Sequence, residues 1–344
     1  MRRIFITGIC GFLGSHLANY FQSIGYKVYG ADNLSRKGSK KNYILLRSKG
    51  VKIFKLDLAK TKKFTLFKNK KVFESFIHCA ALTSVLDGTN ENSIEQLYEN
   101  NLLSTLQSLK ICKVLRAKFI YISSSRVYSI SKINSLKFIV HKNCFKLKKQ
   151  KFHGISQKGI NENFSTESPI SLYGSSKLMC EDLVQEYCNF KNISYVINRC
   201  GLLTGSGQLY KSDQGIVSFW INSWKHKKKL NYIDFGSKGY QVRDCLHPLD
   251  LGNLIKKQIQ FLKSKNKNIL VNVSGGIQSS FSLKELSLWC TKNISQNKIG
   301  KIKKSRPFDL KWIILDNTKA KKLFNWKIKF TKLKIFQDIY FNDN

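Results

Sequence analysis

Tyr173 and Lys177 stand four residues apart in the stretch Ser-Leu-Tyr-Gly-Ser-Ser-Lys at residues 171–177. Two residues at this spacing lie on one face of a helix, about one turn apart. An ammonium beside a phenol favours the phenolate and lowers the phenol pKa, which is ordinarily about 10. Such a phenol can take the proton of an alcohol while a hydride leaves the same carbon. The pair alone is weak support for an enzyme, because a lysine-rich chain forms Tyr-x-x-x-Lys by chance and an exposed helix start has the same pattern.

A glycine-rich turn near the start of the chain predicts a phosphate-binding site. Residues 3–7 have the pattern of a buried strand, and Gly8, Gly11 and Gly14 follow it at a spacing of three. Apolar residues then recur with a helical period up to residue 24. Glycine lets the backbone approach a pyrophosphate, and the start of a helix supplies free N–H groups and positive potential. The strand, the turn and the helix together predict that a dinucleotide binds here.

The acid that ends the second predicted strand, at residues 27–32, indicates which dinucleotide this is. Asp32 follows the last glycine of the turn, and a carboxylate in this place accepts both ribose hydroxyls of adenosine and repels a 2′-phosphate. We therefore expect NAD rather than NADP, although Arg36 and Lys37 lie close enough to weaken the preference.

The next two predicted strands also end in residues suited to a dinucleotide. The third strand, at residues 51–56, leads into Asp57 and Leu58, a natural edge for an adenine pocket. The fourth ends in Ala80 and Ala81, whose small side chains let a cofactor lie against the backbone.

A hydroxyl follows the fifth predicted strand, at residues 119–122. The carboxyl end of a central strand lies over the crevice in which a doubly wound sheet binds its ligands, so we expect Ser124 there. Serines are common in turns, but with Tyr173 and its lysine partner downstream Ser124 completes a candidate triad. Asn101, in a predicted helix at 93–116, either anchors the active-site backbone or is an ordinary polar helix residue.

Later segments are more irregular. The sequence predicts a sixth strand at 193–198, a helix at 251–263, a strand at 269–273 and a helix at 281–290. The polar, lysine-rich segment 129–168 suits an insertion that folds over the active site.

Composition bounds the possible functions of the 344-residue chain. The net charge of +39 comes almost wholly from lysine, and the lysines are spread along the chain, whereas a nucleic-acid-binding face is usually clustered. We therefore expect no specific nucleic-acid partner. No apolar run is long enough for a membrane span, so we expect no membrane partner and a cytoplasmic location. The nine cysteines include no C-x-x-C pair, which predicts reduced thiols and no metal.

These pieces together resemble the extended short-chain dehydrogenase/reductase family of NAD-dependent nucleotide-sugar epimerases and dehydratases. The resemblance rests on Thr7-Gly8-x-x-Gly11-Phe-Leu-Gly14, on Tyr173-x-x-x-Lys177 and on the strand ends described above. The stretches at 32–38, 198–201, 213–215 and 241–248 look most like its CDP-paratose 2-epimerase (CDP-tyvelose epimerase) branch. Ser129, where the family usually has glycine after the tyrosine, and the segment 129–168 depart from the family pattern.

The resemblance implies an α/β fold, a Rossmann-like doubly wound parallel sheet with a smaller interleaved C-terminal substrate lobe. We expect residues 1–198 to form the NAD-binding domain, with 129–168 as an insertion and 240–273 returning to it. Residues 199–239 and 274–344 would form the substrate-binding lobe. The family often forms a homodimer, by packing helices equivalent to 93–116 and 173–190 into a four-helix bundle.

The resemblance also implies roles for single residues. Tyr173 would be the base, Lys177 would hold the nicotinamide ribose and tune the base, and Ser124 would bond the reacting hydroxyl. NAD would be bound by these residues: Thr7, Gly8, Gly11, Phe12, Leu13, Gly14, Asp32, Asn33, Asp57, Leu58, Ala80, Ala81, Asn101 and Lys177. Arginine is scarce in this chain, and a planar guanidinium can bind a diphosphate bidentately. The substrate, a nucleotide-diphosphate sugar, would be bound by these residues: Ser84, Arg126, Arg199, Gln214, Arg243 and Arg306.

Three other functions remain open from the sequence. A 4,6-dehydratase of the family has Asp-Glu directly after the Ser/Thr, where this chain has Ser125 and Arg126. A nucleotide-sugar dehydrogenase or reductase would release its cofactor after each turnover. A non-catalytic protein that binds RNA or another ligand on a Rossmann scaffold would explain the high charge, but it predicts loss of the triad, which is complete here.

Overall fold

The computed structural model describes residues 2–61, 67, 72–89, 91–210, 214–264 and 267–343. Asp213, part of the 213–215 stretch of the resemblance, lies outside the described residues.

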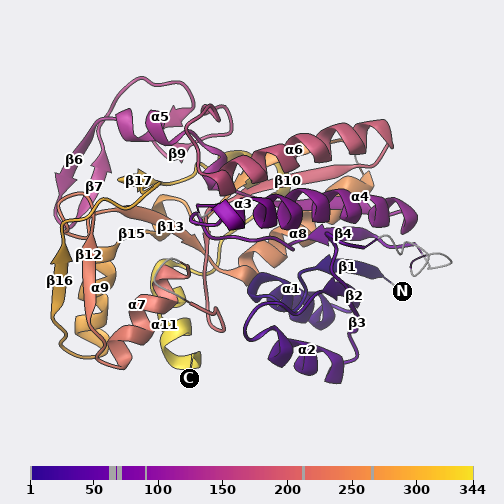
Figure 1. Ribbon diagram of the computed structural model, residues 1–344. Helices are drawn as coiled ribbons and strands as arrows, with labels where there is room; N and C mark the ends of the chain where they lie inside the picture. Colours follow the sequence, from indigo (N-terminus) through magenta and orange to yellow (C-terminus); the bar gives the residue numbers. More distant parts are fainter. Residues whose placement is uncertain are drawn as a thin grey trace.

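Seven parallel strands form the large sheet of the molecule, in the order β14-β10-β5-β4-β1-β2-β3 (Figure 1). The chain changes direction in the sheet between β1 and β4, so ligands are expected outside the carboxyl ends of the strands. This sheet confirms the predicted Rossmann-like α/β fold. Its strands are β1 (Arg3–Thr7), β2 (Lys27–Asp32), β3 (Lys52–Lys55), β4 (Ser75–His78), β5 (Lys118–Ser124), β10 (Tyr195–Cys200) and β14 (Ile269–Val273).

Helices cover both faces of the large sheet, because its strands are apolar on both sides. One face packs against α1 (Phe12–Ser23) and α8 (Pro248–Ser264), and α2 (Ser39–Ser48) lies beside α1. The other face packs against α4 (Ser104–Val114) and α6 (Leu172–Phe190). Figure 1 shows the two layers on opposite sides of the strands.

The helix predicted at 93–116 is divided into three parts. It consists of α3 (Glu91–Tyr98), a π-helical turn at Glu99–Leu103 and α4. A π turn inserts one extra residue per turn and often marks a functional position. Here it carries Asn101, whose side chain is buried.

A second, smaller group of elements surrounds a separate core. One small sheet combines β11 (Leu202–Leu203), β13 (Val242–Leu246), β15 (Ser280–Ser282) and β17 (Trp312–Ile313), and another pairs β12 (Leu230–Ile233) with β16 (Ile299–Ile302). Helices α7 (Ile216–Lys225), α9 (Leu283–Asn293) and α11 (Lys332–Asn342) pack on them. A further helix, α10 (Thr318–Phe324), returns to the large sheet beside α8 and β14.

The expected return of 240–273 to the NAD-binding domain is wrong for its first strand. Strand β13 pairs with β15 and β17 in the small sheet, and only α8 and β14 belong with the large sheet. The partners of β13 stand about 40 and 70 residues further along the chain, so no local pattern reveals the pairing.

The insertion 129–168 does not fold over the main cavity, contrary to expectation, and none of its described residues lines it. It contains α5 (Ile130–Ser135), the strand pair β6 (Phe138–His141) and β7 (Cys144–Leu147), and the strand pair β8 (Ile155–Ser156) and β9 (Gly159–Ile160). Its apolar side chains pack with residues 310–315, and Ile160 donates its N–H to the Ile314 carbonyl over 2.8 Å. The insertion therefore supports the outer side of the small sheet.

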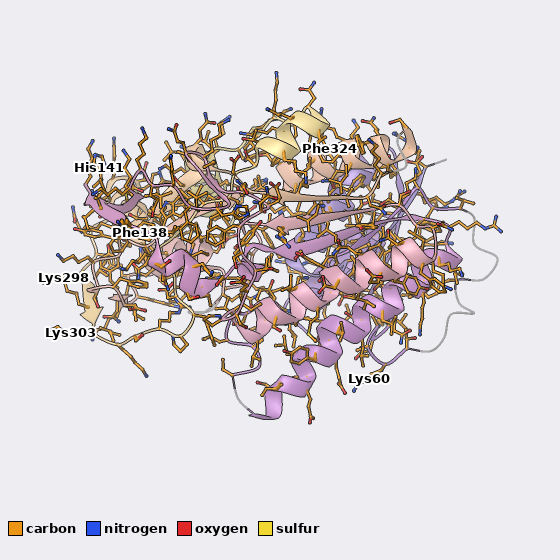
Figure 2. All side chains as sticks on the ribbon, turned by 90° about the horizontal axis from the view of Figure 1, so that it is seen from above. Lys60, Phe138, His141, Lys298, Lys303 and Phe324 are labelled. Carbon is orange, nitrogen blue, oxygen red and sulfur yellow. The ribbon has the colours of Figure 1, made fainter. Side chains whose placement is uncertain are left out.

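Most of the lysines lie on the surface, and most of the cysteines lie in the interior. In Figure 2 the labelled Lys298 and Lys303 lie at one end of the molecule and Lys60 lies near the helices of the large sheet, so lysines are dispersed over the surface. All nine cysteines are free thiols, and seven are buried. Across the part of the chain that the structure describes, no helix is both long and apolar enough to cross a bilayer, and no cluster of metal-ligating side chains forms.

Candidate active site

The glycine turn between β1 and α1 has room only for glycines. Gly8 has φ +63°, and a Cβ there would lie 2.9 Å from the Ala80 backbone. A Cβ on Gly14 would lie 2.1 Å from the Gly8 carbonyl oxygen. Gly11, the N-cap of α1, faces the cavity and is crowded only by Gly8. The turn therefore brings bare backbone and the N-terminus of α1 to the cavity, as a pyrophosphate requires.

Asp32 connects the end of β2 to this turn. One carboxylate oxygen accepts the N–H of Cys10 (2.9 Å) and the other accepts the N–H of Leu34 (2.8 Å). Burial raises the pKa of Asp32, and these two hydrogen bonds and the charge of Arg36 oppose the rise. The carboxylate is thus fixed at the edge of the cavity beside the glycine turn.

Two predicted cofactor residues support the site from behind instead of lining it. The Thr7 hydroxyl accepts the N–H groups of Cys79 and Ala80 and hydrogen-bonds to buried His78. Asn101 donates to the Ser176 hydroxyl (2.8 Å) and its oxygen accepts the Leu82 N–H (2.8 Å). The other predicted residues all line the cavity: Gly8, Gly11, Phe12, Leu13, Gly14, Asp32, Asn33, Asp57, Leu58, Ala80, Ala81 and Lys177.

Ser124, Tyr173 and Lys177 line the same cavity. Ser124 ends β5, and Tyr173 lies in the first turn of α6, where the Ser171 hydroxyl caps the helix by accepting the Gly174 N–H. The Ser124 side chain lies close enough to the phenol to favour its ionised form. Residues far apart in sequence therefore converge at the carboxyl end of β5.

The expected lowering of the Tyr173 pKa is wrong. Burial raises it to about 12, and the neighbouring Ser124 side chain and then the charge of Arg126 oppose this rise. The Lys177 ammonium donates to the Ile122 carbonyl (2.7 Å) and lies 4.4 Å from the centre of the Tyr121 ring. The helical spacing places Tyr173 and Lys177 on one face of α6, but the Lys177 ammonium bonds to a carbonyl of β5.

One continuous cavity of about 1010 Å³ joins the glycine turn, the triad and the small sheet. Gln214, Arg126, Arg243 and Arg306 also line it. A cavity of this volume lies at the upper end of the range for small-molecule sites.

Comparison with known proteins agrees with this geometry. The model of the NAD dependent epimerase/dehydratase family matches residues 4–274. The chain belongs to this family. It is therefore an enzyme of a family whose cofactor is NAD, and the glycine turn, the fixed Asp32 and the cavity described above fit that cofactor.

Individual relatives come from several branches of the family. The chain is similar to CDP-paratose 2-epimerase from Salmonella typhi, with 27% identity over 83% of this chain and 82% of the relative. It is also similar to a putative UDP-glucose 4-epimerase from Methanocaldococcus jannaschii, with 28% identity over 80% and 78% of the two chains. The crystal structure of UDP-glucuronic acid 4-epimerase from Bacillus cereus, in complex with UDP-glucuronic acid and NAD, has a TM-score of 0.77 at 23% identity and covers 98% of each chain.

Two predicted substrate residues of this family member do not reach the cavity. Arg199 is buried and forms a bidentate ion pair with Glu181 of α6, with a shortest distance of 2.7 Å, so it ties β10 to α6. Ser84 is buried in a turn, where its N–H donates to Asp87 and its hydroxyl accepts the Leu86 N–H. Neither is placed to contact a substrate.

Sequence reasoning missed Asp309, which organises the arginines. Its carboxylate accepts Arg243 Nη2 over 2.7 Å, and the other terminal nitrogen of Arg243 donates to the carbonyls of Val242 and Leu310. Arg243 thus uses three of its five N–H donors on protein acceptors. Asp309 also lines the cavity, and the only sequence signal for it was its place just after Arg306.

Proposed function

We propose that the chain is an NAD-dependent epimerase of a nucleotide-diphosphate sugar, acting through a keto-sugar intermediate. The observation that carries this proposal is that Ser124, Tyr173 and Lys177 line the same cavity as the glycine turn. In this proposal Tyr173 is the base beside the nicotinamide ring, and the arginines that line the same cavity bind the diphosphate.

The chain's own residues divide the work as follows. Ser124 would bond the reacting hydroxyl, and Tyr173 would take its proton and later return it. When bound, NAD accepts the hydride of the same carbon and gives it back, so no external reductant is consumed. Lys177 would bind the nicotinamide ribose, and Arg243 and Arg306 would hold the diphosphate while the keto-sugar turns its other face.

Within this class we propose a substrate like that of the CDP-paratose 2-epimerases, with inversion at C2. The similarity to the Salmonella typhi enzyme and the stretches at 32–38, 198–201 and 241–248 support it. A 4,6-dehydratase is disfavoured because Ser125 and Arg126 occupy the two positions that need an acid and a base.

The test is turnover without solvent exchange. The enzyme is incubated with CDP-, UDP-, GDP- and dTDP-sugars in heavy water and followed by NMR. We expect one epimer to form with no deuterium at the inverted carbon and no net change in NADH absorbance. Deuterium at that carbon, or NADH formed in proportion to product, would contradict the proposal.

Tyr173→Phe is the decisive variant. We expect kcat to fall roughly a hundredfold to ten-thousandfold, because the base is lost, while NAD stays bound. Tyr195→Phe, a buried tyrosine on β10 away from the cavity, is the matched control and should keep its activity. Undiminished turnover by Tyr173→Phe would remove the mechanism.

We also propose that the enzyme forms a homodimer through the outer face of α3, α4 and α6. These helices and the π turn between α3 and α4 expose Ile94, Leu103, Val114, Met179 and Phe190 (75% exposed), and exposed apolar side chains that form one patch mark an interaction site. Light scattering should give twice the mass of 39.7 kDa, and Met179→Lys should shift it toward the monomer. A monomer in the unaltered protein would refute this assembly.

A further inference from the structure

A short loop that follows β11 separates part of the cavity from solvent. Gly207 and Leu209 both line the cavity, yet Gly207 is exposed and Leu209 is 56% exposed. Residues that have the cavity on one side and water on the other belong to the outer wall of the cavity. We call residues 206–209 the strap.

The strap lies at the cofactor end of the cavity. A Cβ on Gly207 would lie 3.9 Å from Cε1 of His16, in the helix α1 that begins at the glycine turn. Leu209 packs against Gly38, the N-cap of α2, where an added Cβ would lie 2.6 Å from Leu209 Cδ1. Gly38 lines the cavity in the segment that follows Asp32. The strap therefore runs from beside α1 to the start of α2, the helices on either side of β2 in the chain.

Two acids at the end of α11 hold the strap by its backbone. Asp338 accepts the N–H of Ser206 over 2.7 Å, and Asp343, the C-cap of α11, accepts the N–H of Gly207 over 2.6 Å. Burial opposes the charge of Asp338, but hydrogen bonds with His247 and Ser206 hold its pKa well below the ordinary value. Hydrogen bonds to a charged acceptor are stronger than those to a neutral one. Two successive N–H groups of the strap are thus fixed by side chains that are distant in sequence.

Each acid is also anchored by a residue outside the strap. His247 is hydrogen-bonded to the Asp338 carboxylate over 3.3 Å. Asn222 of α7 donates to the Asp343 carboxylate over 3.2 Å, and Lys225 at the end of α7 donates to the Asp343 carbonyl over 2.6 Å. Helix α11 packs beside α7 (Figure 1). The two carboxylates are therefore held in place by the small lobe and can position the strap.

We propose that Asp338 and Asp343 are positioning residues for the cofactor: by holding the strap in the outer wall of the cavity, they slow the release of NAD. They act through the N–H groups of Ser206 and Gly207. Asp343 also lines the cavity, but both of its carboxylate oxygens have protein partners. The inference concerns the cofactor of the family alone, so it does not depend on which sugar nucleotide the enzyme converts.

The test measures how fast NADH leaves the enzyme. The protein is loaded with NADH and mixed with a large excess of NAD, and the change in NADH fluorescence follows the release. Asp343→Ala should release NADH about tenfold faster, because a hydrogen bond to a charged acceptor no longer holds the strap. Leu209→Ser should also speed the release, from the other end of the strap, and should leave the melting temperature unchanged because Leu209 is largely exposed.

Thr331→Ala is the matched control for a general loosening of α11. The Thr331 hydroxyl caps the opposite end of this helix by accepting the Lys334 N–H, and Thr331 does not line the cavity. Loss of an N-cap destabilises a helix. This variant should therefore lower the melting temperature and still release NADH at the rate of the unaltered enzyme.

An unchanged rate in Asp343→Ala or Leu209→Ser, or an equal acceleration in Thr331→Ala, would overturn the proposal. If Asp343→Ala fails to fold, Asp343→Asn, which keeps the size of the side chain and loses its charge, gives the answer in the same assay. The readout is cofactor release without turnover. Its outcome is therefore separate from the fate of the proposed function, which the activity of Tyr173→Phe decides.

Discussion

The two ends of the cavity are built in different ways. At the cofactor end the cavity wall is mainly backbone: it consists of the glycines of one contiguous turn, the start of α1 and the fixed Asp32 carboxylate. At the substrate end the cavity wall is formed by side chains: Arg126, Arg243 and Arg306 come from segments that are distant in sequence. A site made of backbone leaves a local spacing pattern in the sequence, and a site made of converging side chains does not.

Variants of the Arg199–Glu181 pair test whether Arg199 belongs to the fold or to the substrate end of the cavity. Removing one partner leaves a buried charge, so Glu181→Gln should destabilise the fold by about 3–5 kcal/mol. Replacing both by methionine should recover much of this loss, because two apolar side chains need no partner. Urea unfolding measures both variants.

The same variants decide whether Arg199 contacts substrate. For a residue that acts only through the fold, the KM of the double variant should equal that of the unaltered enzyme. A rise in KM with no loss of stability would indicate that Arg199 contacts the diphosphate.

Gly14→Ala tests whether the bare backbone of the glycine turn is needed to bind the cofactor. The added Cβ would lie 2.1 Å from the Gly8 carbonyl oxygen, so the turn must open. We expect a loss of stability of about 1–3 kcal/mol and at least a tenfold weaker hold on NAD. Gly50→Ala is the matched control: Gly50 has φ +80° but nothing within 4 Å, so backbone strain acts alone there. Equal NAD retention by both variants would contradict the claim.

Asp32→Asn tests the one side chain on which the cofactor end depends. Loss of the charge should reduce the preference for NAD over NADP by roughly tenfold, since a hydrogen bond to a charged acceptor contributes about 1.5–3 kcal/mol. Asp57→Asn separates a general loosening from this effect, because the Asp57 carboxylate also accepts a backbone N–H, that of Ala59. The measurement is competitive binding of the two dinucleotides, and an unchanged ratio would mean that Asp32 serves only the turn.

This division explains what the sequence could predict. The large sheet, the glycine turn and the triad rest on local periodicity and strand ends, and the fold followed from them. The pairing of β13 with β17 and the ion pair of Arg243 with Asp309 each join segments more than 60 residues apart, so no window of the sequence contains them. The direction of the Lys177 ammonium also escaped, because the Ile122 carbonyl that attracts it belongs to another element.

Gln214 lines the cavity next to the cofactor end and gives the smallest expected effect. Predicted as a substrate residue, it instead donates to the Thr83 hydroxyl over 2.5 Å and accepts a long 3.5 Å bond from Arg36, both next to the cofactor end. Leu209, from the same stretch of chain, packs against Gly38, the N-cap of α2. Loss of these exposed hydrogen bonds should cost about 1 kcal/mol, so Gln214→Ala should release NAD about fivefold faster while KM for the sugar nucleotide stays the same. Thr83→Val, which removes the acceptor, should match it, and a change confined to KM would return Gln214 to the substrate end.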